Sequence, residues 1–449
     1  MTRSRLFDIS SVFSGDSVRQ RFARGTIGSF AGSLISQAAG MIASILCARI
    51  LDREGFGELG MIRTTLLVFA FLAGTGLGMA ATKFVAEWRD IDPARTGRYI
   101  GLFMKIGMVT GIGATLVCIV GAIPLAVYAL KAPHLAGALM LGSAMLLFST
   151  LNLIQLCVLI GLERFRIVAQ LVALDGILNL LLIPSGASIA GVNGAVAASS
   201  LAAVLVFPLR RWYLRKACEA RGIAVHADAE PLEAESARRF ALPAILVGIA
   251  AQPFDWLASA ILARTAGGYA ELGYFAVANS WAQLILFLPG QLAAATQPIL
   301  ANLMGKRDHA RIVLILTRGT ALVAAFATVI AVLVILLSEV IVSVYGPSYR
   351  AASGVLSILA ISSIFSALSG IFKNFLFACD RVWAVVGAQL MMGIVLCTIA
   401  WLEGARGAAG LALAYIFGWS SLLVCEVVVS VSGIQSIQRS ASNGAPKTS

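Results

Sequence analysis

Seven charged residues lie within, or at the ends of, long apolar stretches of this sequence. A charge near the middle of a membrane-spanning helix costs about 2.5–3.5 kcal/mol on insertion scales, so such residues usually face an interior and usually serve a function. Basic groups there would bind an anion such as phosphate, and acidic groups would bind a proton or a sodium ion. The substrate-binding candidates are the cations Arg63, Lys83, Lys105, Arg318 and Lys373, and the ion-coupling candidates are Asp175 and Asp255.

The two acids are expected at different depths. Asp255 lies about fourteen residues into its predicted helix, which at about 1.5 Å per residue is roughly 20 Å and near the membrane midplane. A structural hydrogen bond to neighbouring backbone is the alternative to ion coupling for this residue. Asp175 lies about eight residues into another predicted helix, with Asn179 one turn further on the same face. For Asp175, ion coupling and structural pairing are both open.

The cations divide by the side of the membrane to which they lie nearer. Lys105 and Arg318 occupy matching places in the two halves of the sequence, near the predicted cytoplasmic ends of their helices. A ring of such cations at the mouth of a cavity would attract an anionic head group. The alternative for these residues, and for Lys83 and Lys373, is that the long side chains reach the membrane surface. Arg63 lies nearer the opposite side, where it would hold a diphosphate or pair with an acid.

The residue types that most often bind metals give no signal here. The seven cysteines form no C-x-x-C pair, and His134, His226 and His309 all fall in predicted loops. We therefore predict no metal site and no cofactor, which weakens an enzymatic interpretation.

The elements that must position these residues are transmembrane helices. The chain is 59% hydrophobic and only 12% charged, whereas soluble domains carry about 25% charged residues. Its apolar runs are about twenty residues long, as a helix needs to cross a bilayer, and they lack the alternation of a β-barrel. The predicted spans are 27–48, 57–80, 100–122, 136–159, 167–184, 189–208, 241–263, 274–296, 312–336, 352–377, 383–402 and 408–430.

The basic residues predict how these spans are oriented. Outside the spans, 24 Lys and Arg lie in the termini and alternate connections on one side, and six lie on the other. By the positive-inside rule, both termini and the long loop 209–240 are cytoplasmic. The net charge of +12 is spread over these membrane-flanking segments, so it does not indicate nucleic-acid binding.

The second half of the sequence repeats features of the first at an offset of about 213–217 residues. Ala48-Arg49 before Glu58-Leu59-Gly60 matches Ala263-Arg264 before Glu271-Leu272-Gly273, and Gly191-x-x-Gly194 matches Gly407-x-x-Gly410. Because each half has six spans, the repeats enter the membrane in the same sense. The predicted organisation is an arm 1–26, a lobe of six helices 27–208, a linker 209–240, a second six-helix lobe 241–430 and a tail 431–449.

With these motifs the chain resembles the polysaccharide transport and oligosaccharide flippase branch of the multidrug/oligosaccharidyl-lipid/polysaccharide (MOP, MATE-like) exporter superfamily. The resemblance covers nearly the whole chain and includes Lys83-Phe84-Val85-Ala86-Glu87 and the segment Glu271-Leu272-Gly273-Tyr274-Phe275. It implies an all-α protein of about twelve transmembrane helices in two parallel six-helix repeats. It also implies export of an undecaprenyl-diphosphate-linked oligosaccharide across a bacterial inner membrane, by alternating access between two lobes.

Three functions are candidates for a chain with these features. The leading hypothesis is a flippase for surface polysaccharide, O-antigen or exopolysaccharide, with membrane lipids, a polysaccharide polymerase and glycosyltransferases as candidate partners and no nucleic acid. The second is a cation-coupled multidrug exporter, which would need carboxylates, often in the first helix, where residues 27–48 have none. The third is a membrane glycosyltransferase or polymerase, which the short loops without a Gly-rich phosphate-binding motif disfavour.

Overall fold

The computed structural model describes residues 16–226, 230–231, 233, 235–237, 250, 252–305, 309–379 and 381–443, and every regular element in them is helical. Nine helices in this part of the chain are long and apolar enough to cross a membrane. The α-helices are α1 (Asp16–Trp88), α2 (Pro93–Pro124), α3 (Ala136–Gly161), α4 (Phe165–Glu219), α6 (Gln252–Ala263), α7 (Gly268–Gly305), α8 (His309–Leu336), α9 (Ser338–Ser343), α10 (Ala352–Ala378), α11 (Val382–Leu402) and α12 (Gly407–Asn443). The short elements are the π-helix η2 (Leu125–Ala129) and the 3₁₀ helices η3 (Pro133–Leu135), η4 (Pro347–Tyr349) and η5 (Gly404–Arg406).

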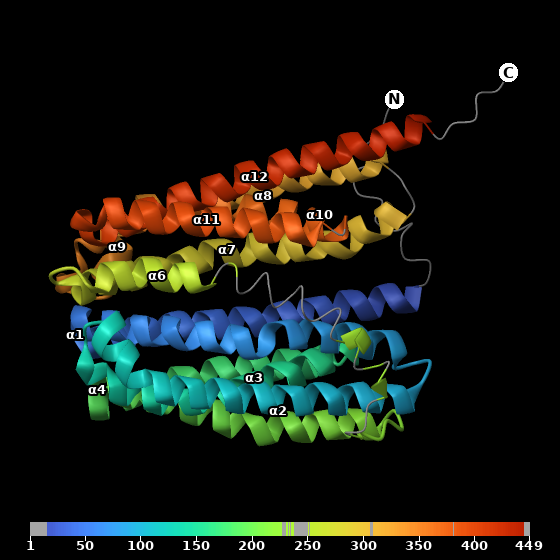
Figure 1. Ribbon diagram of the computed structural model, residues 1–449, viewed down its shortest axis with the longest axis horizontal. Helices are drawn as coiled ribbons and strands as arrows, with labels where there is room; N and C mark the ends of the chain where they lie inside the picture. Colours follow the sequence, from blue (N-terminus) through green and yellow to red (C-terminus); the bar gives the residue numbers. More distant parts are fainter. Residues whose placement is uncertain are drawn as a thin grey trace.

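Two of the helices are interrupted by a turn and run in two directions. In α1 the turn is at Asp52, whose φ of 56° lies in the left-handed region. In α4 it is at Ala190 and Gly191, and Gly186 and Gly194 on either side approach so closely that a Cβ on one would overlap the other's carbonyl. Figure 1 shows α1 reversing at its turn, so each of these two helices supplies two passes through the molecule.

The helices form two bundles, one of α1–α4 and one of α6–α12 (Figure 1). The first residues of α1 and the last of α12 lie at the same end of the molecule, which we call the terminal end; the turn of α1 at Asp52 lies at the opposite end, the turn end. One hydrophobic core at the turn end includes residues of both bundles, such as Leu130 and Tyr349. Toward the terminal end each bundle has its own core.

The bundles meet at the turn end through matched glycines. A Cβ on Gly57 would overlap the carbonyl of Tyr269, and a Cβ on Gly273 would overlap the carbonyl of Arg53. At the offset of the sequence repeat, Gly57 corresponds to Gly273 and Arg53 corresponds to Tyr269. The second half of α1 and the start of α7 therefore cross with their backbones in contact. The Arg53 guanidinium donates to the Tyr274 hydroxyl at 2.7 Å across the same crossing.

The turns of the two bundles also correspond. Gly191 has φ 58° and ψ −139°, and Gly407, the residue matched to it in the sequence, has φ 61° and ψ −137°. The helices after the two turns therefore start from the same backbone conformation. Other residues with positive φ fall in the corresponding connections of the two halves, Asp52 with Gly267 and Lys131 with Gly346.

The segment predicted as a linker, 209–240, begins as helix. Because α4 continues to Glu219, its last turns extend past the predicted span end at residue 208. Beyond it, Glu233 is buried and accepts from Arg98 at 2.9 Å, at the start of α2. The Arg98 side chain thus holds part of this connection against the first bundle.

Candidate functional site

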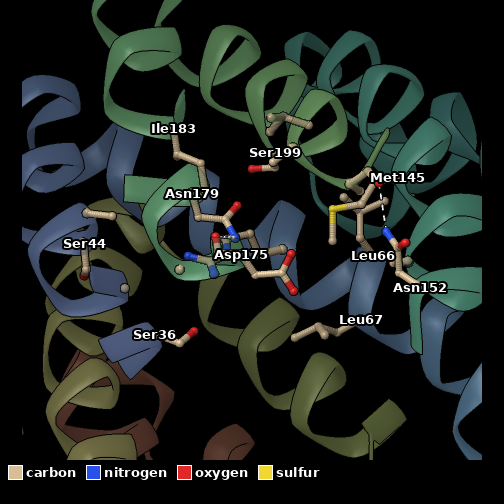
Figure 2. A pocket seen from close by; sticks show the side chains of 18 of the residues that line it. Ser36, Ser44, Leu66, Leu67, Met145, Asn152, Asp175, Asn179, Ile183 and Ser199 are labelled. Atoms are coloured by element: carbon tan, nitrogen blue, oxygen red, sulfur yellow. Dashed lines mark hydrogen bonds between the residues drawn. The ribbon is translucent and has the colours of Figure 1, made fainter. Parts of the chain in front are cut away.

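A cavity of about 500 Å³ lies inside the first bundle, between the two halves of α1, α3 and the two halves of α4. Figure 2 shows Ser36 and Ser44 of α1 on one side, Asn152 of α3 on the other, and Asp175 of α4 between them. Apolar side chains make up the rest of the wall. The polar lining residues are Ser36, Ser44, Arg63, Ser149, Asn152, Asp175, Asn179, Ser199 and Arg210.

Arg63 is exposed to this cavity deep in the molecule. It lies eleven residues after Asp52 in the second half of α1, and at about 1.5 Å per residue this places it roughly 16 Å from the turn, close to mid-membrane. Among the described residues its guanidinium has no hydrogen-bond or ion-pair partner, although it lines the cavity with Phe56 and Leu59 of the same helix face. A planar guanidinium with five donors can bind a phosphate oxygen pair in such a place.

The carboxylate of Asp175 already has a partner within the protein. Arg210, only 4% exposed, forms an ion pair with it. The same guanidinium donates from Nη1 to the carbonyl of Asn152 at 2.8 Å, and Asn179 donates to the backbone carbonyl of Asp175. Of the two interpretations left open for Asp175, this geometry favours structural pairing.

Sequence reasoning missed Arg210 because it placed the end of the sixth span at residue 208. The helix instead continues, and Arg210, Leu214 and Ala217 are all buried. Their i, i+4, i+7 spacing is that of one packed helix face. This spacing was the signal in the sequence that could have identified Arg210 as an interior residue.

Asp255 lies in the other bundle, apart from this cavity. In α6 its carboxylate accepts a hydrogen bond from the Tyr415 hydroxyl of α12, and Cys397 of α11 lies near it. The next residue, Trp256, donates from its indole Nε1 to Thr65 of α1 at 2.9 Å, linking the two bundles. The two predicted ion-coupling acids therefore do not form one site, and the role of Asp255 stays a prediction.

Lys105 and Arg318 lie on exposed apolar faces, outside the residues that line the cavity. Lys105 lies on the same face of α2 as four exposed apolar residues, Val109, Ile112, Leu116 and Val120. Arg318 lies in the same way among the exposed residues Leu314, Leu322, Val329, Val332 and Leu336 of α8. Because α2 packs on α1 and α3, and α8 on α7 and α10, these faces point away from the crossing of the bundles. The placement favours side chains that reach the membrane surface; a role in substrate binding stays a prediction.

The last two predicted cations also lie outside the cavity lining. Lys83 is exposed, and its Nζ lies 5.5 Å from the centre of the Phe84 ring. Lys373 is partly buried in α10 and acts electrostatically on Glu426 of α12. Glu426 is fully buried and was not singled out in the sequence, where it lies within the predicted span 408–430 but only four residues from its end; an acid inside an apolar span was the signal that could have found it. Of the five predicted cations, the structure brings only Arg63 into the cavity.

The fold is similar to solved structures of transporters. An inward-facing multidrug resistance MATE family transporter of the MOP superfamily matches with a TM-score of 0.74 at 14% identity, covering 91% of this chain and 96% of that one. An outward-facing MATE family transporter matches at 0.71, with 15% identity and coverage of 97% and 100%. A MOP superfamily transporter from Pyrococcus furiosus, described by a reverse polarity of its binding pocket that suggests a different function, matches at 0.73, with 15% identity and coverage of 97% and 99%.

The long apolar helices are those of a multi-pass membrane protein, and the fold is that of the MOP superfamily transporters it matches. The sequence profile of the polysaccharide biosynthesis protein family matches residues 22–304, more than half of the chain, and a MatE profile matches residues 243–402. The chain belongs to the polysaccharide biosynthesis protein family. No curated protein sequence matches it. The predicted superfamily and the predicted all-α membrane fold are thus confirmed.

Proposed function

We propose that the protein is a flippase that carries an undecaprenyl-diphosphate-linked oligosaccharide across a bacterial inner membrane for surface polysaccharide synthesis. In this proposal it has twelve spans, with two in α1 and two in α4, arranged as two parallel six-helix repeats with both termini in the cytoplasm. The matched turns at Gly191 and Gly407 support the repeat. The family to which the chain belongs supports a substrate of polysaccharide synthesis.

The observation that carries the proposal is the unpaired Arg63 in the membrane-embedded cavity. Since Arg210 and Asp175 neutralise each other, the charged groups in the lining leave one net positive charge. A low-dielectric wall strengthens its field on an anion. The volume of about 500 Å³ suits a diphosphate with its first sugar, and Ser36, Ser44 and Asn179 offer polar groups to hydroxyls. The Pyrococcus furiosus transporter of this fold is described by a reverse polarity of its binding pocket that suggests a different function, so the fold likeness to MATE transporters does not require this chain to share their substrates.

The proposed cycle follows from the packing of the two bundles. They share a hydrophobic core at the turn end and have separate cores toward the terminal end. Because the terminal end is cytoplasmic in this proposal, the head group would enter between the bundles from the cytoplasm. It would bind Arg63 while the lipid tail stays in the bilayer, and opening of the turn end would release it outside. An inside-negative potential favours outward movement of each negative charge by about 2.3 kcal/mol per 100 mV.

Replacement of Arg63 tests this proposal. In a host deleted for the gene, we expect Arg63→Gln to abolish surface polysaccharide at unchanged membrane levels of the protein, and Arg63→Lys to retain part of it because the charge remains. The readouts are polysaccharide on gels and protein by immunoblot. Normal polysaccharide with Arg63→Gln would contradict the proposal. The double variant Lys105→Gln, Arg318→Gln tests the predicted cation ring separately. It should lose surface polysaccharide only if the ring helps the anionic head group to reach the cavity.

A cation-coupled multidrug exporter is the second candidate, and the likeness to MATE structures favours it. A site for cationic drugs needs an acid free to pair with them, and Asp175 in the cavity is already paired. Deletion of the gene discriminates between the candidates. Loss of polysaccharide with unchanged drug resistance supports the flippase, whereas increased drug sensitivity with normal polysaccharide supports the exporter.

A further inference from the structure

A second polar site lies in the other bundle, around Glu426 of α12. The side chain is fully buried, at 0% exposure, within the apolar part of the helix. One turn before it, Leu422 packs with Ala388 and Met392 of α11. An acid in such a setting has lost its water, and its charge must be compensated by the protein or removed by a proton.

The hydrogen bonds of Glu426 leave its charge largely uncompensated. Ser369 of α10 donates its hydroxyl to Oε2 at 2.6 Å, and the buried Oε1 has no hydrogen-bond partner among the described residues. One turn further along α12, the buried Ser430 hydroxyl is also without a partner in that part of the chain. One neutral donor is too few for an ionised carboxylate, which accepts on two oxygens. A proton on Oε1 removes the charge and this deficit.

One charged group in the described part of the chain acts on Glu426 electrostatically without forming an ion pair with it. Lys373 lies one turn after Ser369 on the same face of α10 and acts electrostatically on Glu426, yet no ion pair joins the two in the described residues. The other elements place one further cation beside this part of α12: Arg381, just before α11, donates from Nη1 to the carbonyl of Val429 at 3.4 Å, about one turn after Glu426. Residues 382–402 of α11 contain no charged side chain, and Cys425 is the neighbour of Glu426 on α12. The acids of the adjacent helices are bonded elsewhere: Glu271 of α7 to Ala408 at the far end of α12, and Asp255 of α6 to Tyr415, three turns away. Arg318 of α8 is exposed.

We propose that Glu426, with Ser369 and Lys373, is a proton-binding site that couples transport to the proton gradient. The inference rests on the proposed flippase function and names its coupling ion. A proton from solution binds Oε1 and gives a neutral acid, the form that fits the hydrogen bonding of the present structure and leaves Lys373 unpaired with Glu426. When the proton leaves, the carboxylate attracts the Lys373 ammonium into an ion pair, which draws α10 and α12 together. Protonation thereby changes the packing of the second bundle.

Infrared spectroscopy tests proton binding directly on the purified full-length protein in lipid nanodiscs. The difference spectrum between acidic and alkaline buffer should contain the C=O band of a buried protonated carboxyl. Glu426→Gln should remove this band. Glu403→Gln is the matched control, because the partly exposed Glu403 pairs with the exposed Arg406 at 2.9 Å, and it should leave the band unchanged. A band that persists in Glu426→Gln would overturn the assignment.

Proteoliposomes test the coupling, with a fluorescent short-chain polyprenyl diphosphate carrying one N-acetylglucosamine as the probe. We expect an imposed pH gradient to accelerate movement of the probe several-fold in the wild type. In Glu426→Gln the rate of probe movement should be the same with and without the imposed gradient. If the wild type moves the probe but ignores the gradient, or if Glu426→Gln still responds, the coupling inference is wrong. If the wild type does not move the probe at all, the proposed function fails, and proton binding is judged on the infrared band.

Discussion

The pair of Arg210 and Asp175 illustrates how a charged residue in a membrane helix can be structural. Arg210 is almost completely buried and donates both to Asp175 and to the carbonyl of Asn152. Removing one member leaves the other as a buried or half-buried charge without its partner. Removing both leaves no charge to compensate, so the two residues should be coupled energetically.

We therefore predict a non-additive double-mutant cycle. Arg210→Met should destabilise the protein by about 1–3 kcal/mol, because the Asp175 carboxylate that it leaves unpaired is partly exposed. Asp175→Asn should cost about 3–5 kcal/mol, because it leaves a buried guanidinium without its partner. The double variant should lose less than the sum. Thermal unfolding in detergent measures all three. Additive losses, or a sodium-dependent stability that Asp175→Asn abolishes, would instead support an ion-coupling role for Asp175.

At the residue scale, the sequence could predict which side chains are unusual but not which of them meet. The apolar residues on both sides of Arg63 and Asp175 identify these two as unusual, because the free energy of inserting a charged residue into the membrane can be judged from the local sequence. The cavity joins them through three helices distant in the chain, and the partner of Asp175 lies 35 residues further along it. The outward orientation of Lys105 follows from the packing of α2 on α1 and α3, which periodicity cannot reveal in a helix that is apolar on all sides.

Gly407 shows how a single residue sets the direction of an element. Its backbone has φ 61°, and a Cβ would overlap the Glu271 carboxylate that accepts from the Ala408 amide at 2.7 Å. Gly407→Ala should therefore destabilise the protein by about 1–3 kcal/mol, from backbone strain and the displaced carboxylate. The control is Gly387→Ala in α11, where a Cβ meets open space and helix propensity predicts a gain of up to about 1 kcal/mol. Thermal unfolding compares the two; equal effects would contradict this account.

At the element scale, hydrophobic run length predicts the helices well. Predicted spans such as 136–159 and 383–402 fall within α3 (Ala136–Gly161) and α11 (Val382–Leu402). The ends were less predictable, since α4 continues past residue 208 as a helix with polar and aromatic residues. The seventh predicted span, 241–263, is only partly testable, because residues 241–249 and 251 lie outside the described residues.

The whole molecule depends on how its two bundles touch. At the turn end, Gly57 and Gly273 bring α1 and α7 into backbone contact, Arg53 bonds Tyr274, and the Tyr349 hydroxyl donates to the carbonyl of Ala48 at 3.1 Å. The offset of the sequence repeat predicts that Gly57 and Gly273 are equivalent, but not that they face each other. That arrangement requires the two bundles to meet around an axis, which is a property of the assembled fold.

If the protein works by alternating access, this contact must open during each cycle. Ser44 and Ser280 offer a test, because their hydroxyl oxygens lie 3.1 Å apart across the two bundles, close enough for paired cysteines to approach disulfide geometry. We expect Ser44→Cys with Ser280→Cys to form a disulfide under oxidation, to stop surface polysaccharide export, and to recover on reduction. The single variants control for the seven native cysteines, none of which forms a disulfide in the structure, and oxidation should not change the export activity of either single variant. Full export with the disulfide completely formed would mean that the bundles need not part here, and that the head group leaves by another route.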